Sequence, residues 1–240
     1  MDPTLTVLLY SSLAAGTAVF GAGPFVVREE LPVARIGWAN ALAAGLMLGA
    51  AYALIAVGLG DAVSWGAAGA ALGIGFVYWT HGVSGTHDVD LNRLNETSPE
   101  YGYQVLLTHS LHSASEGVAI GVAMVVDERF GVLMALAIAV HNVPEATVLC
   151  AILTSRGVRV VDAAGLAVAT NVSQVLLAVV AFAVITAAPA TLPWALGFAV
   201  GALVYLVMAE LLPESYRQAG STTIALVTIA TMGVVVFVIG

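Results

Sequence analysis

Long apolar segments follow one another along the chain and are separated by short polar connections. Each is close to the roughly 20 residues that an α-helix needs to cross a bilayer. Sixty per cent of the residues are hydrophobic and only 9% are charged, against about 25% charged in soluble domains. The runs are continuously apolar and lack the alternation of barrel strands. The sequence therefore predicts an all-α, polytopic membrane protein, one transmembrane domain over residues 1–240, with eight transmembrane helices at about 5–27, 36–58, 63–80, 103–126, 131–154, 158–187, 192–210 and 222–239.

The arginines predict the orientation of the chain. All 7 basic residues are arginines, and they lie between the apolar segments. In an eight-span topology, one side of the membrane receives Arg28, Arg35, Arg93, Arg156, Arg159 and Arg217. The other side receives Arg129 alone. By the positive-inside rule the arginine-rich side is cytoplasmic. We therefore expect a multi-pass protein of the cell membrane with both termini outside and a cytoplasmic polar loop over 81–102.

Charge and cysteine content exclude several classes of function. The net charge of −8 offers no basic face, so we expect no nucleic-acid partner. Cys150 is the only cysteine, which rules out an internal disulfide. We favour a small core residue over a metal ligand at this position. The N-terminus lacks the positive region of a secretory signal, so we expect the first segment to be retained as a span.

Two carboxylates, Glu116 and Glu145, lie in the middle of apolar segments that contain neither lysine nor arginine. Each follows a histidine by four residues, so His112 shares a helix face with Glu116, and His141 shares one with Glu145. A charged side chain at the bilayer centre costs about 2.5–3.5 kcal/mol on insertion scales. A divalent ion supplies the missing counter-charge, and this ligand set suits Zn²⁺, Fe²⁺, Mn²⁺ or Co²⁺. The pattern predicts a metal site of His112, Glu116, His141 and Glu145.

Other polar side chains are expected at a similar depth. Asn171 and Gln174 lie near the centre of the sixth segment, and Met47 lies near the centre of the second. Ser113 and Asn142 adjoin the two histidines and could add oxygen ligands. We include Met47, Ser113, Asn142 and Gln174 as secondary candidate ligands. Core packing is the favoured interpretation for Met47 alone, and interhelical hydrogen bonding for Asn171.

Several polar residues outside this set admit more than one interpretation. His109 lies one turn from His112, and its candidate roles are a second stop for the ion, a proton acceptor or a structural histidine. Glu210 and Glu214 read as interfacial, with a place along an exit path as the less favoured alternative. The polar loop reads as solvated rather than metal-collecting; its titratable residues are His81, His87, Asp88, Asp90, Glu96 and Glu100.

Two backbone features add to the prediction. Pro144 cannot donate to the carbonyl of Val140, which favours a kink in the fifth span. The second and seventh spans contain similar small-residue runs, 41–47 and 195–203. These two spans run in opposite senses, so the similarity fits an inverted repeat, and it equally fits a shared Ala/Gly composition.

Three motifs carry a resemblance to a known family. The run 137–145 ends in His-Asn-x-Pro-Glu, and 112–121 reads His-x-x-x-Glu-Gly-x-Ala-x-Gly. The run 197–214 contains Gly-Ala-x-x-Tyr and Glu-x-x-Pro-Glu. These runs resemble the ZIP (Zrt/Irt-like) metal transporters of prokaryotic type. The resemblance implies eight helices, an inverted repeat of helices 1–3 and 6–8 around helices 4–5, and often a homodimer. It also implies that the transported metal binds His112, Glu116, His141 and Glu145, with Met47 as a possible further ligand.

The chain departs from the family pattern around a second metal. Family members with a two-metal centre typically place Asn beside the helix-4 histidine and further acids on helices 5 and 6. Here the corresponding residues are Ser113, Asn142 and Gln174, which carry no charge. Ser115 stands where the family has a proline in helix 4. We therefore predict a single metal site, or a weak second one.

These observations together predict transport of a divalent metal ion toward the cytoplasm. Zn²⁺ is the first choice, with Fe²⁺, Mn²⁺, Co²⁺ and Cd²⁺ as alternatives, and the ion is a substrate rather than a cofactor. We predict no catalytic residue and no enzyme activity; the lipid bilayer and the ion are the expected partners. A membrane metalloenzyme and a metal-free proton-conducting or sensor protein stay as alternatives. The sequence contains no His-Glu-x-x-His motif, which disfavours the metalloenzyme. Metal analysis of the purified protein would test the metal-free alternative.

Overall fold

The computed structural model describes residues 2–28, 31–58, 62–84 and 99–239. All regular structure in these ranges is helical. His87, Asp88, Asp90, Arg93 and Glu96 of the predicted polar loop lie outside them. The helical elements are α1 (Pro3–Gly16), η1 (Thr17–Ala22), α2 (Gly23–Val27), α3 (Val33–Gly58), α4 (Val63–Ser84), α5 (Pro99–Val126), α6 (Glu128–Thr154), α7 (Val160–Thr170), α8 (Val172–Ala187), η3 (Pro189–Thr191), α9 (Leu192–Leu206), η4 (Val207–Leu211), α10 (Leu212–Ala219) and α11 (Ser221–Ile239).

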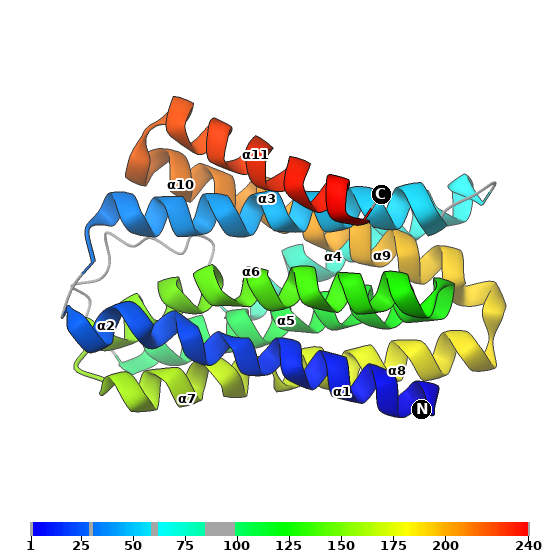
Figure 1. Ribbon diagram of the computed structural model, residues 1–240, viewed down its shortest axis with the longest axis horizontal. Helices are drawn as coiled ribbons and strands as arrows, with labels where there is room; N and C mark the ends of the chain where they lie inside the picture. The colour runs from blue at the N-terminus through cyan, green and yellow to red at the C-terminus, as the bar shows by residue number, and fades with distance from the viewer. Residues whose placement is uncertain (1, 29–30, 59–61, 85–98, 240) are drawn as a thin grey trace.

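The helices lie side by side in one bundle, with both chain termini toward the same end (Figure 1). By length and composition, 6 helical stretches can cross a membrane. They are Pro3–Val27, Val33–Ala56, Glu128–Thr154, Val160–Ala187, Pro189–Ala219 and Ser221–Ile239. The all-α, multi-pass class is thereby confirmed. Helices α4 and α5 belong to the same bundle (Figure 1) but are not among the 6, so eight crossings stay a prediction.

Glycines hold α4 against α9 at backbone contact. A Cβ added at Gly197 would lie 1.9 Å from the carbonyl oxygen of Gly66, and one at Gly73 would lie 2.1 Å from that of Phe198. Small residues let helix backbones approach closely where lipid supplies no hydrophobic drive for association. Close packing at this seam fixes where the last turn of α4 meets the end of α9.

The pair α5 and α6 occupies the middle of the bundle. Asp127 separates the two helices, and its carboxylate accepts from the backbone N–H of Phe130 at 2.9 Å, which caps α6. This short turn makes the two helices antiparallel neighbours. Helix α8 packs on α5 where Gly117 faces the carbonyl of Gln174, and η1 packs on α6 where Gly21 faces Ala146.

Breaks in helical geometry occur in three of the 6 stretches that can cross a membrane, numbered in chain order. The first passes from α1 through the 3₁₀ turn η1 into α2. The fourth stretch, Val160–Ala187, is interrupted at Asn171, between α7 and α8. The fifth stretch contains the π-helical turn η4. Helix α6, in contrast, is a single helix from Glu128 to Thr154 that includes Pro144.

The α4–α9 seam generates a stability prediction. Gly197→Ala should destabilise the folded protein by about 1–3 kcal/mol, because the added methyl group forces two backbones apart. Gly75→Ala is the matched control, since a Cβ at Gly75 on α4 meets nothing within 4 Å. Thermal unfolding in detergent, followed by size-exclusion chromatography, measures both. Equal melting temperatures for the two variants would contradict the packing.

Candidate metal centre

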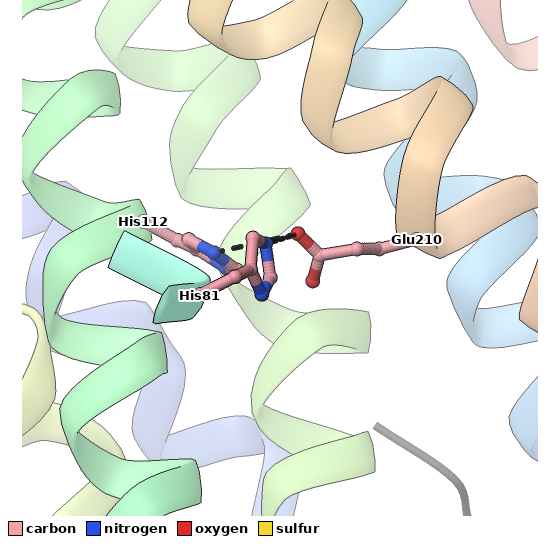
Figure 2. A group of neighbouring side chains, drawn as sticks. All are labelled: His81, His112 and Glu210. Carbon is pink, nitrogen blue, oxygen red and sulfur yellow. Dashed lines mark hydrogen bonds and ion pairs between the residues drawn. The ribbon is translucent and has the colours of Figure 1, made fainter. Parts of the chain in front are cut away.

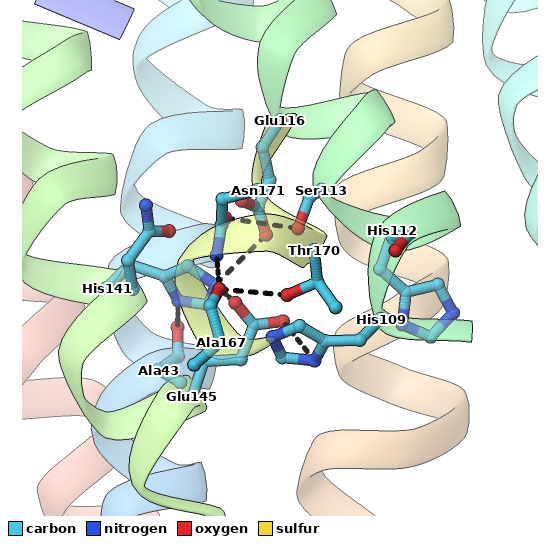
Figure 3. A network of polar contacts seen from close by, with 12 residues as sticks. Ala43, His109, His112, Ser113, Glu116, His141, Glu145, Ala167, Thr170 and Asn171 are labelled. Atoms are coloured by element: carbon cyan, nitrogen blue, oxygen red, sulfur yellow. Dashed lines mark hydrogen bonds and ion pairs between the residues drawn. The ribbon is translucent and has the colours of Figure 1, made fainter. Parts of the chain in front are cut away.

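Helices α5 and α6 bring Glu116 and His141 to similar depth. Glu116 lies 11 residues before the turn at Asp127 and His141 lies 14 residues after it, so their distances along the helices are about 16 and 21 Å. Nε2 of His141 lies 3.1 Å from a carboxylate oxygen of Glu116. The same atom lies 3.5 Å from an oxygen of Glu145, one turn further along α6. All three side chains are buried, and their ligand atoms lie within 4.8 Å of one another (Figure 3).

The orientation of His141 is fixed from α3. Its Nδ1 lies 3.2 Å from the backbone carbonyl oxygen of Ala43 (Figure 3). A carbonyl only accepts, so Nδ1 carries the proton in this contact. In a neutral imidazole Nε2 is then a bare acceptor, and it faces Glu116 and Glu145, which also only accept when ionised. Three acceptor atoms therefore converge, and a cation at that point neutralises all of them.

The buried carboxylates also have oxygens without hydrogen-bond partners. Oε2 of Glu116 and Oε2 of Glu145 are both in this state. The ion pairs recorded for these two acids are with histidines, including His109, whose Nδ1 lies 3.6 Å from Oε1 of Glu145. A buried polar atom without a partner is costly unless a ligand, ion or water satisfies it. The arrangement therefore leaves buried acceptor atoms that an ion or a water could satisfy.

His112 lies apart from the other three residues of the predicted site. Its Nε2 lies 3.5 Å from Oε1 of Glu210, and its ring centroid lies 5.4 Å from that of His81 (Figure 2). The structure thus brings together Glu116, His141 and Glu145, and it places His112 in a second group with His81 and Glu210.

The secondary candidates divide between the site and a neighbouring amide network. Met47 is buried and lines a small void together with Glu116 and His141. The hydroxyl of Ser113 donates to Asn171 at 3.1 Å. Asn142 and Gln174 also hydrogen-bond to each other. Nδ2 of Asn142 donates to Oε1 of Gln174 at 3.1 Å and to the carbonyl of Ala14 at 2.8 Å.

A cavity of about 90 Å³ is lined by Glu145 of the first group and by His112 and Glu210 of the second. A buried water needs roughly 10–15 Å³ measured in this way, so the cavity has room for several waters or for a hydrated ion. Its polar lining includes His109, His112, Glu145, Glu210 and Glu214. Arg217 also lines it and pairs with Glu214, at the end of the bundle where α10 lies. The cavity therefore extends from the buried acids toward the arginine-rich end of the protein.

The sequence did not predict that His81 and Glu210 lie together beside His112. His81 was grouped with the polar loop, yet it is buried in the last turn of α4. Glu210 was interpreted as interfacial, yet it contacts both histidines. The one available signal was the Glu-x-x-Pro-Glu run, which places an acid one turn before a proline in an otherwise apolar stretch.

Comparison with known proteins identifies the family of the chain. The family model described as ZIP Zinc transporter matches residues 81–239, which include α5, α6 and both ligand groups. The chain belongs to the ZIP zinc transporter family. The resemblance stated from the sequence is thus confirmed.

Individual relatives give the same result. A putative zinc transporter of Arabidopsis thaliana is 32% identical over 224 residues, covering 92% of this chain and 36% of that protein. Zinc transporter GufA of Myxococcus xanthus is 31% identical over 47% of this chain and 44% of its own length. Zinc transporter ZIPB of Bordetella bronchiseptica is 30% identical over 55% of this chain and 43% of its own length. The matched regions thus span less than half of each of these ZIP relatives.

The converging acceptors predict stabilisation by metal. Saturating Zn²⁺ should raise the melting temperature of the detergent-solubilised protein, because a ligand at 100 times its Kd adds about 2.7 kcal/mol. Glu116→Gln should lose most of this shift. Its metal-free stability should not fall, because the amide N–H can donate to Nε2 of His141 while a buried charge is removed. Thr147→Val on α6 is the control and should keep the shift, because the recorded contact of its hydroxyl is with the carbonyl of Val143 and not with either acid. An undiminished shift in Glu116→Gln would contradict this site.

Proposed function

We propose that this chain transports divalent transition-metal ions, with Zn²⁺ as the preferred substrate, across the membrane toward the cytoplasm. The observation that carries the proposal is the convergence of Nε2 of His141 with oxygens of Glu116 and Glu145 in a buried site. Two carboxylates cancel the charge of a divalent ion and remove the desolvation cost for ion and protein together. The zinc transporters among the relatives support zinc as the substrate.

The core site is proposed to hold one ion. Glu116, His141 and Glu145 supply the ligands, and buried Met47 lies beside the same void as a further soft donor. The amides of Asn142 and Gln174 satisfy each other across α6 and α8. Neutral amides already engaged in hydrogen bonds do not supply the charge that a second divalent ion needs. Fe²⁺, Mn²⁺, Co²⁺ and Cd²⁺ share the required coordination chemistry and are the competing substrates to test.

A path for the ion follows from the cavity. Glu145 belongs both to the core site and to the cavity lining. Beyond it the lining carries the carboxylates of Glu210 and Glu214, which attract a cation that leaves the core. Arg217, at this end, lies on the side that the positive-inside rule assigns to the cytoplasm. The ion would therefore leave toward the cytoplasm along a cavity that carboxylates line.

Pairwise packing supports the inverted repeat as the basis of transport. If α3 corresponds to α9 and α4 to α11, the contact of α3 with α11 has its counterpart in α4 with α9, and both pairs pack closely. The contact of α1 and η1 with α6 likewise corresponds to that of α8 with α5. The first span of each proposed repeat is broken, at η1 and at Asn171. Rocking of repeats about a central site is a common transport mechanism.

The lipid bilayer is the proposed surroundings of the bundle. Large apolar side chains point outward along its length; Phe237 is 89% exposed, Val161 79% and Leu226 65%. Such a surface requires an apolar solvent. We propose a transporter and not a metalloenzyme, in agreement with the ZIP family, and the buried acids argue against a role in which metal never binds.

Flux measurement tests the proposal. In proteoliposomes, Glu145→Ala should lower Zn²⁺ uptake by at least about tenfold, because loss of even an outer-shell partner costs 10–100-fold in metal affinity. His112→Ala should also lower uptake, because His112 lines the cavity beside Glu145. Asp162→Asn is the control, because Asp162 pairs with exposed Arg159 at the start of α7, away from the site. Competition with Fe²⁺, Mn²⁺, Co²⁺ and Cd²⁺ ranks the substrates. Uptake by Glu145→Ala at the rate of the control would refute the transport role of this site.

A further inference from the structure

A hollow opens on the outer surface of the bundle between η1, α3 and α6. Its volume is about 410 Å³. Leu136 and Val140 on its wall are 53% and 59% exposed, so the hollow is open to the surroundings of the bundle. We call it the α3–α6 groove, and it is lined by Thr17, Leu42, Leu46, Leu136, Ala139, Val140, Val143 and Pro144.

The side chains of the α3–α6 groove favour a hydrocarbon occupant. Among the recorded lining residues, Thr17 alone has a polar side chain. Its hydroxyl is already engaged with the carbonyls of Ala14 and Ala139, at 2.6 and 2.7 Å. A polar ligand placed against these side chains would lose hydration without gaining a partner from them. An apolar ligand loses nothing by the same contact.

The groove lies at the depth of the core site. Leu42 adjoins Ala43, whose carbonyl contacts His141, and Val140 adjoins His141 itself. His141 is the central residue of the 27 in α6, so each end of that helix is about 20 Å away. The hydrocarbon core of a bilayer is about 30 Å thick, which places lipid headgroups about 15 Å from its centre. The part of a lipid that reaches this depth is its acyl chain.

The dimensions of the groove argue against a second copy of this chain as the occupant. The lining covers 136–144 on α6 and 42–46 on α3, which are lengths of about 12 and 6 Å. A transmembrane helix of a second copy would need contact along about 30 Å. One turn of such a helix, about 10 Å across, already fills about 420 Å³. A single flexible chain fits a short hollow of this size better than a second helix does.

Leu46 connects the groove to the ion site. It lines the groove and also the small void beside Glu116 and His141. A chain seated in the groove therefore contacts the same segment of α3 whose carbonyl at Ala43 orients His141. We propose that the α3–α6 groove binds one acyl chain of a bilayer lipid, and that its occupancy changes the affinity of the core site for Zn²⁺. The coupling rests on the proposed ion site; the lipid site does not.

Photo-crosslinking tests the lipid site directly. The probe is phosphatidylcholine with a diazirine in the middle of one acyl chain, added in trace amount to proteoliposomes. Peptide mass spectrometry should find more adduct on residues 136–143 than on 226–233 of α11. Ile229 in that reference segment lies near the middle of α11 and is 68% exposed, more than Val140. Adducts distributed in proportion to exposure would overturn the proposal.

Substitutions that fill the groove should displace the lipid. Ala139→Phe fills it from α6 and Leu42→Trp fills it from α3, since both residues line it. Each should lower the adduct on the opposite wall to the level of the α11 reference. Ala230→Phe is the control, because Ala230 is exposed near the middle of α11. Wild-type labelling of the groove in a monodisperse variant of either kind would overturn the lipid site.

Zinc titration in nanodiscs tests the coupling. Branched diphytanoyl and straight-chain dioleoyl phosphatidylcholine present chains of different width to the groove. The Kd of the wild type for Zn²⁺ should differ between the two lipids by about fivefold or more. The Kd of Ala139→Phe should be nearly the same in both, because its groove is already filled.

The outcomes separate the lipid site from the function. Equal Kd values for the wild type in the two lipids, together with a labelled groove, would refute the coupling. Undetectable zinc binding by the wild type would refute the proposed ion site and the coupling with it. The crosslinking result decides the lipid site in either case.

Discussion

Negative charge buried at membrane depth dominates the energetics of this bundle. Glu116 and Glu145 come from different helices, yet both face the same nitrogen of His141. Their side chains are almost fully enclosed, at 0% and 8% exposure for the residues. Two ionised acids this close repel each other and lose hydration, so the folded state depends on a positive charge between them. The surrounding helices enclose both side chains.

Enclosure is achieved with small residues. Helix α8 reaches α5 at Gly117, one residue after Glu116, where any side chain would collide with the carbonyl of Gln174. The polar groups of α8 can therefore hydrogen-bond into the centre: Gln174 meets Asn142, and Asn171 meets Ser113. Close backbone approach and interhelical hydrogen bonds are two of the interactions that hold helices together inside lipid. Both act at the same level of the bundle as the ion site.

Part of the candidate site could be proposed from the sequence because its signal is local. A histidine and an acid four residues apart share a helix face whatever the rest of the chain does, and this applies to His141 and Glu145. The same rule predicted that His112 would join them, but the two ends of an i,i+4 pair can still contact different neighbours. His112 lies beside α4 and η4, and its imidazole contacts residues that those elements supply.

Other features depended on information that periodicity does not contain. His81 and Glu210 are 129 residues apart in the chain, and only tertiary packing brings them together. The break at Asn171 and the π-helical turn at Glu210 lie in continuously apolar stretches, where hydropathy indicates a span but not its regularity.

The hydrogen bond between His141 and the carbonyl of Ala43 has a mechanical consequence. It attaches an ion ligand on α6 to the backbone of a different span, α3, which itself packs along α11. Any tilt of α3 relative to α6 must stretch this bond or rotate the imidazole, and either change alters how well Nε2 donates its lone pair. Helix displacement and binding strength are therefore thermodynamically linked at one atom, so an ion that binds tightly in one tilt is held more loosely in another.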